Sequence, residues 1–268
     1  MIARAGGRRS RGALERGRVA LFGAAVALLV VALLPPVGSL AREHAFVGAL
    51  QFGLFATVVP ASVVVASPWG LAWREGAWAV VRAWATRTAA RRLRHRSPGW
   101  SAGYVLFYVA ATIGWRTPAA VDALVRLPAL SLLEAATLVV AGVLLWLELV
   151  PASPFVPRSA FPVRIALAAV AMWVTWIMAY LLGMSHSDWF TAYHHTPGAG
   201  LSLIADQQLA AGMLWLLAAV GFVPLVFATL VVWLRTGEDL DEELRKVARA
   251  ERRTWSPPVR ERRRGESG

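Results

Sequence analysis

Long apolar runs separated by arginine-rich stretches are the feature that most constrains this chain. A helix needs about 20 consecutive apolar residues to cross the hydrocarbon core of a bilayer, and its backbone hydrogen bonds must be satisfied internally. The sequence of 268 residues is 57% hydrophobic, yet its formal net charge is +12. A soluble chain does not combine these values, because its surface has too few places for so many apolar side chains. We therefore predict an all-α, polytopic membrane helix bundle.

Six apolar runs have the length, or nearly the length, of a membrane span. They cover residues 18–37, 46–68, 100–115, 129–150, 163–184 and 208–234. The third is the weakest, because its apolar stretch extends only from Ser101 to Trp115. On this basis the chain divides into a basic N-terminal tail (1–17), a six-span membrane domain (18–234) and a charged C-terminal tail (235–268).

The distribution of basic residues predicts the orientation of the spans. Cytoplasmic segments of membrane proteins carry an excess of Lys and Arg. With a cytoplasmic N-terminus, all but three of the 28 Lys and Arg residues fall in cytoplasmic segments; the exceptions are Arg42, Arg116 and Arg126. We therefore expect cytoplasmic N- and C-termini in a multi-pass protein of the bacterial cytoplasmic (inner) membrane.

The first apolar run also has features of a cleaved signal peptide. Arg16 and Arg18 precede it, and Ser39-Leu40-Ala41 has the small-x-small form of a cleavage site. The long segment before the run and its end at Pro35-Pro36 favour a retained span. Cleavage would leave the rest of the topology unchanged.

The connection 69–99 interleaves tryptophan with arginine. Such spacing suits a helix that lies in the anionic cytoplasmic interface. A nucleic-acid partner is not needed to explain the charge, because it follows the pattern of the spans. The expected partner is therefore the lipid bilayer. In the C-terminal tail, the pairs Asp241 with Arg245 and Glu242 with Lys246 predict a solvated helix.

Polar residues that could carry chemistry gather in the connection between the fifth and sixth spans, which lies on the predicted outer side. This connection has no Lys or Arg, and the chain has no cysteine, which excludes thiolate sites and disulfides. His and Met with a nearby carboxylate are suitable copper ligands. The candidate metal ligands are Met184, His186, His194, His195 and Asp206. Ordinary loop polarity is the alternative, because no fixed ligand spacing is present.

Further polar residues stand at the ends of the spans. Asp206, Gln207 and Gln208 open the last apolar run, where a carboxylate is costly: about 2.5–3.5 kcal/mol at the bilayer centre and less near its edge. We expect these three side chains to shape a polar pocket with Glu134 and His186 as neighbours. In the second span, His44 and Gln51 share a helical face, and an interhelical hydrogen bond is the simpler role for Gln51.

Gly212, beside Ala210 and Ala211, predicts a small patch where another helix approaches closely, with Trp215 on the same helix. No nucleophile–base pair, phosphate loop or dinucleotide fingerprint is present, so we do not expect an enzyme. The lack of an internal repeat also weighs against a transporter built from inverted halves.

One stretch resembles a known signature. Asp206-Gln207-Gln208-Leu209-Ala210-x-x-Met213-x-Trp215 is similar to the Asp-Gln-Gln-Leu-Ala-Gly-x-x-Met-Trp motif of the caa3-type cytochrome c oxidase assembly factors, the CtaG-like proteins. Here the glycine comes one residue late, and Leu214 separates the Met from the Trp. Weaker similarities at Phe46–Pro68, Trp115–Asp122 and Glu134–Trp146 extend the resemblance to about Phe46–Leu234.

Several histidines of that family are missing from this chain. Gly48 and Phe52 stand where the family has histidines in the second span, and Glu134-Ala135 replaces Glu-His in the fourth. Arg116 or Thr117 stands where the family has a histidine in an outer loop. The residues that could substitute for them are His44, His186, His194 and His195.

The resemblance implies a non-enzymatic membrane protein that helps to assemble a haem-copper oxidase of the respiratory chain. Its partners would be oxidase subunits or a copper chaperone, and copper would be handled on the outer face. Because the family's histidines are missing, two alternatives stay open. One is a metal-free accessory subunit or scaffold, and the other is a permease for a small solute or copper.

Overall fold

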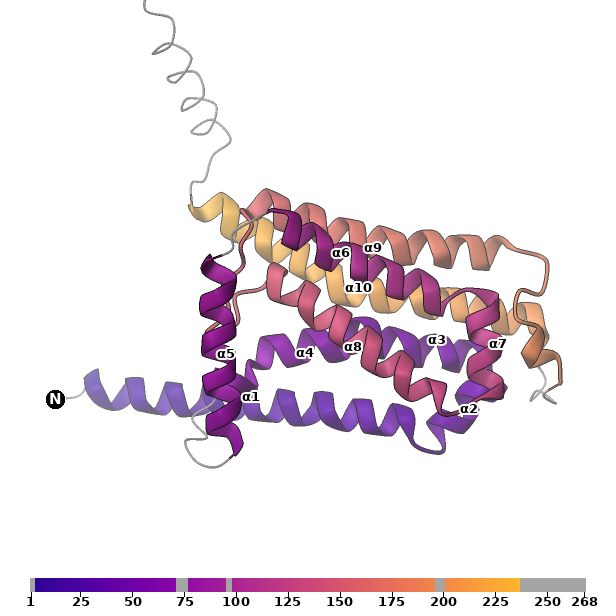
Figure 1. Ribbon diagram of the computed structural model, residues 1–268, viewed down its shortest axis with the longest axis horizontal. Helices are drawn as coiled ribbons and strands as arrows, with labels where there is room; N and C mark the ends of the chain where they lie inside the picture. The colour runs from indigo at the N-terminus through magenta and orange to yellow at the C-terminus, as the bar shows by residue number, and fades with distance from the viewer. Residues whose placement is uncertain (1–2, 71–76, 95–97, 196–200, 237–268) are drawn as a thin grey trace, which may run out of the picture. The chain divides into compact units, whose positions relative to one another are not determined.

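The computed structural model describes residues 3–70, 77–94, 98–195 and 201–236, with the side chains of 12–70, 79–94, 99–193 and 201–236. Within these ranges the regular secondary structure is helical, apart from one isolated bridge between Ala152 and Phe155 (Figure 1). The predicted all-α class is therefore confirmed for the part of the chain that is described. Two compact units are present, 1–229 and 230–268, and all contacts discussed below lie within the first.

The helices follow one another in a simple order along the chain. They are α1 (Ala3–Leu33), α2 (Val37–Glu43), α3 (Ala45–Gly53), the π-helix η1 (Leu54–Val58), α4 (Val59–Ala66), the 3₁₀-helix η2 (Pro68–Gly70), α5 (Ala77–Arg94), α6 (Pro98–Trp115), α7 (Pro118–Arg126), α8 (Leu130–Leu149), α9 (Phe161–Met184), the 3₁₀-helix η3 (Thr191–His195) and α10 (Leu203–Thr236).

Among the described residues, five segments are long and apolar enough to cross a membrane. They are Gly12–Leu33, Ala45–Gly70, Leu130–Leu149, Phe161–Met184 and Leu203–Thr236. Each overlaps one predicted span. The third predicted span, 100–115, corresponds to α6, which packs against α8 and α9 but is not among the five. The first span ends at Leu33 rather than at residue 37, because the two prolines that follow cannot donate backbone hydrogen bonds to continue the helix.

The second span is widened at its middle. Pro60 has no N–H to donate to the carbonyl of Ala56. The π-helix η1, whose hydrogen bonds span five residues and not four, lies just before Pro60. Two glycines pack against this bulge. A Cβ on Gly142 would lie 2.5 Å from Cγ of Pro60, and a Cβ on Gly221 would overlap the Thr57 side chain. These glycines let α8 and α10 approach the bulge closely, a role that the sequence did not reveal.

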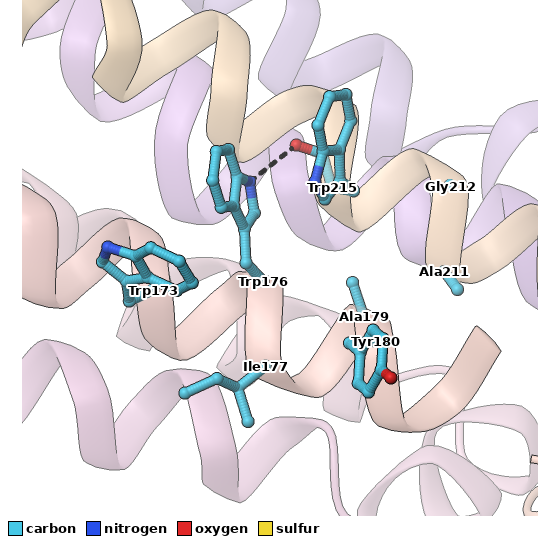
Figure 2. A pocket seen from close by; sticks show the side chains of 8 residues that line it. All are labelled: Trp173, Trp176, Ile177, Ala179, Tyr180, Ala211, Gly212 and Trp215. Atoms are coloured by element: carbon cyan, nitrogen blue, oxygen red, sulfur yellow. Dashed lines mark hydrogen bonds between the residues drawn. The ribbon is translucent and has the colours of Figure 1, made fainter. Parts of the chain in front are cut away.

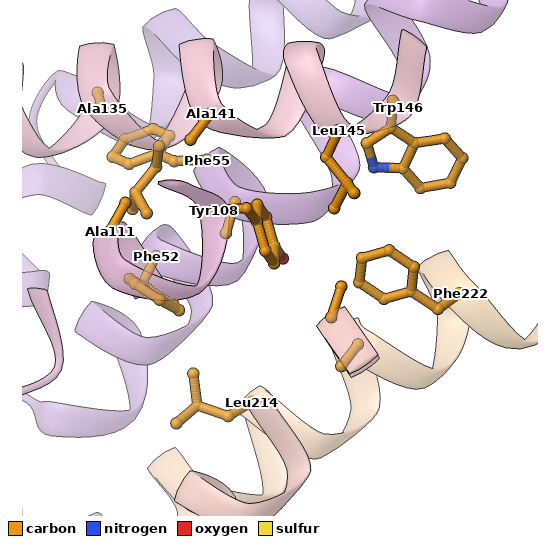
Figure 3. Close-up of a cluster of buried hydrophobic side chains, with 14 of the residues drawn as sticks. Phe52, Phe55, Tyr108, Ala111, Ala135, Ala141, Leu145, Trp146, Leu214 and Phe222 are labelled. Atoms are coloured by element: carbon orange, nitrogen blue, oxygen red, sulfur yellow. The ribbon is translucent and has the colours of Figure 1, made fainter. Parts of the chain in front are cut away.

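Aromatic side chains fill the space between the spans (Figure 3). The Trp146 and Phe222 rings stack with centroids 5.7 Å apart, and Tyr108 meets Phe222 edge to face at 6.3 Å. Phe52 and Phe55 from the second span are also fully buried. The core thus joins α3, η1, α6, α8 and α10, and holds the polar ends of these helices in place.

The tryptophan- and arginine-rich connection forms the helix α5, as the sequence predicted. Figure 1 shows α5 running across the direction of α1 and α8. Trp84 and Val80 are exposed, together with Arg82, Arg87 and Arg91, whereas Arg92 is buried. The predicted helix of the C-terminal tail lies outside the described residues.

Candidate functional site

Asp206 caps a helix that precedes it by 160 residues. Its Oδ2 accepts a hydrogen bond from the backbone N–H of Ala45 at 2.7 Å, and its Oδ1 accepts one from Phe46 at 3.0 Å. These are the first two N–H groups of α3, which have no partner inside the helix. His44 is the N-cap residue by position but makes no side-chain cap bond. A buried carboxylate at the positive end of α3 is thus stabilised without a metal.

Gln207 holds the connection that precedes α10 in place through side-chain hydrogen bonds. Its Nε2 donates to the carbonyls of Leu182 at 3.2 Å and Ser187 at 3.3 Å, and its Oε1 accepts from the N–H of Trp189 at 3.0 Å. The amide is buried, so these bonds fix the path of the chain between α9 and α10. The neighbouring Gln208 is exposed.

Asp122 has a similar role that the sequence did not single out. Its carboxylate accepts from the Thr191 hydroxyl at 2.6 Å and from the N–H of Ala192 at 3.0 Å. It therefore caps η3 from α7. In the sequence Asp122 is only an acidic residue at the end of the Trp115–Asp122 stretch, and its partner Thr191 lies 69 residues away.

Arg116, the residue after α6, and Glu134 of α8 form a buried ion pair. Nη2 of Arg116 lies 3.7 Å from Oε1 of Glu134 and donates to the carbonyl of Gly48 at 3.3 Å. The guanidinium carbon lies 4.4 Å from the Phe52 ring centroid. Burial lowers the pKa of Arg116, and the charge of Glu134 opposes this effect. Nε of Arg116 and Oε1 of Glu134 are buried and make no hydrogen bond within the described structure, so the two groups are held together by their charges.

A small cavity of about 20 Å³ adjoins this ion pair, with Gln51, Ser131 and Tyr193 in its lining. It has room for about one water molecule. Nε2 of Gln51 donates to the carbonyl of Ala32 at 2.8 Å, which is the interhelical hydrogen bond expected from the sequence. A second cavity of about 10 Å³ adjoins Asp206 and shares Tyr193. Neither Glu134 nor His186, the expected neighbours of Asp206, lines it.

We call Asp122, Arg116, Glu134, Asp206 and Gln207 the polar end of the bundle. Met184 and His186, two of the candidate copper ligands, are exposed. His194 and His195 belong to η3, but their side chains lie outside the described part of the structure. Among the described residues no group of three or more His, Asp or Glu side chains is placed to hold a metal ion. The described part of the polar end therefore does not fit a buried copper site.

A groove of about 470 Å³ lies between α9 and α10 (Figure 2). Trp215 stacks on Trp176 with ring centroids 5.4 Å apart, and Nε1 of Trp176 donates to the carbonyl of Trp215 at 3.2 Å. Gly212 lines the groove, and a Cβ built there would meet no atom within 4 Å. In this chain Gly212 is therefore not a point of close helix contact.

The chain matches one known protein family over most of its length. The model of the family described as cytochrome c oxidase caa3 assembly factor matches residues 2–236. The chain belongs to this family. The match extends the resemblance seen in 46–234 to include the first span. Searches of curated proteins and of solved structures gave no match.

The positions at which the sequence resemblance implies histidines lie close together in the structure. Gly48, Phe52 and Glu134 mark positions where the resemblance implies histidines or a Glu-His pair, and all three contact the guanidinium of Arg116. In this chain the guanidinium of Arg116 therefore lies among these three positions. It would repel a metal ion held at the same place.

Proposed function

We propose that this protein assists the assembly of a haem-copper oxidase as a metal-free membrane scaffold. Membership in the caa3 assembly family supports the link to the oxidase. The observation that carries the metal-free role is that both buried carboxylates of the polar end already have partners. Glu134 is paired with Arg116, and both oxygens of Asp206 accept backbone hydrogen bonds.

The scaffold acts through its shape rather than through chemistry on a bound group. Asp206, Gln207 and Asp122 each tie a loop or helix end to a distant helix. Buried, satisfied polar contacts of this kind specify one arrangement of the chain. The result is a rigid polar end for oxidase subunits to recognise.

Copper capture by the exposed connection is the second candidate function. Met184 and His186 are exposed two residues apart, and both are ligand types that copper accepts. In this alternative copper is cargo, held at the surface and not inside the bundle.

We further propose a six-span topology in which α6 is the third span and both termini are cytoplasmic. The packing of α6 beside α8 and α9 supports its place in the membrane. The clustering of Lys and Arg in alternate segments supports the orientation.

A strain that lacks the protein tests the assembly function. We expect its oxidase to be reduced in amount or incompletely assembled, as measured by haem and copper content per oxidase in purified membranes. The gene for the wild-type protein, restored to the strain, should recover both. Unchanged oxidase content and activity in the deletion strain would contradict an assembly role.

Copper analysis of the purified protein separates the two candidates. The scaffold proposal predicts no copper above background after purification in copper-replete medium. Stoichiometric copper that is lost in His186→Ala and Met184→Ala would support surface capture instead.

A further inference from the structure

Three arginines converge on the last turn of α8, at the opposite end of that helix from Glu134. Glu148 is fully buried there, and its Oε1 lies 2.6 Å from Nη2 of Arg92 and 3.7 Å from Nε of Arg158. Arg164 donates from Nε to the carbonyl of Leu149 at 2.8 Å, and also from Nη2. We call Arg92, Arg158 and Arg164 the arginine cluster.

The single carboxylate of this cluster is fully used. Oε1 of Glu148 is engaged by Arg92, and Oε2 accepts from the Ser101 hydroxyl at 3.1 Å and from the N–H of Arg158 at 3.4 Å. The carbonyl end of α8 adds a partial negative charge. Among the described residues, the two positive charges of Arg92 and Arg158 therefore face the one negative charge of Glu148. The site carries an excess of positive charge.

Several donors of the cluster are buried and have no hydrogen-bond acceptor among the described residues. Nε of Arg92 and both Nε and Nη1 of Arg158 are buried and make no hydrogen bond in the described structure. The Arg158 side chain is only 6% exposed. Buried donors are nearly always hydrogen-bonded, and an unsatisfied charged donor is especially costly. The arrangement is therefore incomplete without a further acceptor.

An aromatic ring holds two of the guanidinium groups in place. The Tyr104 ring centroid lies 5.7 Å from Cζ of Arg92 and 5.8 Å from Cζ of Arg158. Arg92 also lies 5.4 Å from the Phe155 ring centroid. Such contacts favour the cations and orient their planar faces. The N–H edges are thus preorganised for an acceptor.

We propose that the arginine cluster binds a phosphate group, either on an anionic phospholipid headgroup or as free phosphate. Guanidinium groups match phosphate oxygens in charge and geometry, and an anion would both accept the free N–H groups and offset the excess charge. Water would accept hydrogen bonds from the buried N–H groups but would not offset the excess positive charge of the cluster.

The surroundings of the cluster favour the lipid as the source. Helix α5, which supplies Arg92, exposes Arg87 and Arg91 together with Trp84 and Leu93. Exposed arginine beside exposed aromatic and aliphatic side chains is typical of a helix in the headgroup layer. The cluster would then hold one phosphate of that layer against the end of α8.

Native mass spectrometry of the purified full-length protein tests this site. The lipid probes are dioleoylphosphatidylglycerol and, as a zwitterionic control, dioleoylphosphatidylcholine. The variant is Arg158→Gln, which removes free donors but leaves the Arg92–Glu148 pair. Its matched control is Arg126→Gln, which makes the same charge change at an exposed position in the last turn of α7.

We expect the wild type and Arg126→Gln to retain phosphatidylglycerol in preference to phosphatidylcholine, and Arg158→Gln to bind it at least fivefold more weakly. If millimolar inorganic phosphate displaces the lipid or alone raises the melting temperature only when Arg158 is present, the site takes free phosphate as well. Equal retention of phosphatidylglycerol by both variants, or no binding of either probe by the wild type, would overturn the proposal.

A second variant covers the case in which Arg158→Gln does not fold. Arg158→Lys keeps the charge but lacks the forked N–H groups. We expect it to be recovered as a folded protein and to bind phosphatidylglycerol more weakly than the wild type. Unchanged binding would contradict a role for the guanidinium fork.

Discussion

Asp206 and Glu134 are both buried among apolar helices, and each is stabilised by a different kind of partner. Asp206 accepts two N–H groups from the start of α3. Glu134 faces the guanidinium of Arg116. The loss of the Asp206 carboxylate and the loss of the Glu134 carboxylate should therefore have different consequences. The backbone amides left by Asp206 lose acceptors, whereas Arg116 becomes an unpaired buried charge without Glu134.

Asp206→Ala should destabilise the protein by about 1.5–3 kcal/mol per lost charge-assisted hydrogen bond, before any relaxation. The measurement is thermal unfolding in detergent. Gln208→Ala is the matched control, because Gln208 is two residues away and exposed, and such changes usually stay within about 0.5 kcal/mol. Equal melting temperatures for the two variants would contradict the capping role.

Arg116→Met should cost about 3–5 kcal/mol, because it leaves Glu134 as an uncompensated buried charge. The double variant Arg116→Met with Glu134→Gln should recover most of this loss, since no net charge is then buried. A double-mutant cycle of unfolding free energies measures the coupling. Additive effects of the two substitutions would show that the pair does not interact.

At the scale of helices, the bulge in the second span explains which glycines are needed for close helix packing. Gly142 packs against Pro60 and the carbonyl of Ala56, whereas Gly212 opens onto the groove between α9 and α10. Both stand in long apolar helices, so their sequence contexts look alike. Their surroundings in the fold differ.

Gly142→Ala should destabilise the protein by about 1–3 kcal/mol, because its methyl group would overlap the Pro60 ring and a backbone carbonyl. Gly212→Ala should be neutral or slightly stabilising, because its methyl group meets open space and alanine favours helix. Thermal unfolding of both variants in one detergent checks the difference. The reverse order of stability would contradict the packing described for α4 and α8.

The approximate positions of the five long apolar helices could be predicted because they depend on local composition, but α10 begins at Leu203 and not at the predicted residue 208. The predicted limits 129–150 and 163–184 agree within two residues with α8 and α9. The site could not be predicted in the same way. Asp206 and its partner Ala45 are 161 residues apart, and nothing in a single sequence pairs them. The roles of Gly142 and Asp122 likewise depend on which helices meet, which a hydrophobic pattern does not reveal.

At the scale of the whole molecule, orientation can be measured directly because the chain has no cysteine. We expect a single cysteine at Ser187 to react with a membrane-impermeant maleimide in intact spheroplasts. A single cysteine at Thr86, exposed on α5, should react only after the membrane is opened. The opposite labelling pattern would overturn the proposed topology.

The described structure combines a rigid polar end, an apolar core and a basic end around Glu148. Family membership connects it to the caa3 oxidase assembly factors. The histidines outside the 69–99 connection are His44, His186, His194 and His195. A metal-free scaffold should not need any of them, whereas copper handling by this chain would depend on at least some.

The most direct test of the metal-free scaffold role uses a deletion strain that carries a variant lacking these four histidines. The measurement is the copper content of the oxidase. The variant replaces each of them by glutamine and is compared with the wild type at equal membrane abundance. Our account predicts that the variant restores copper per haem in the oxidase to the wild-type value. Oxidase that contains haem but lacks copper in the variant strain would contradict it.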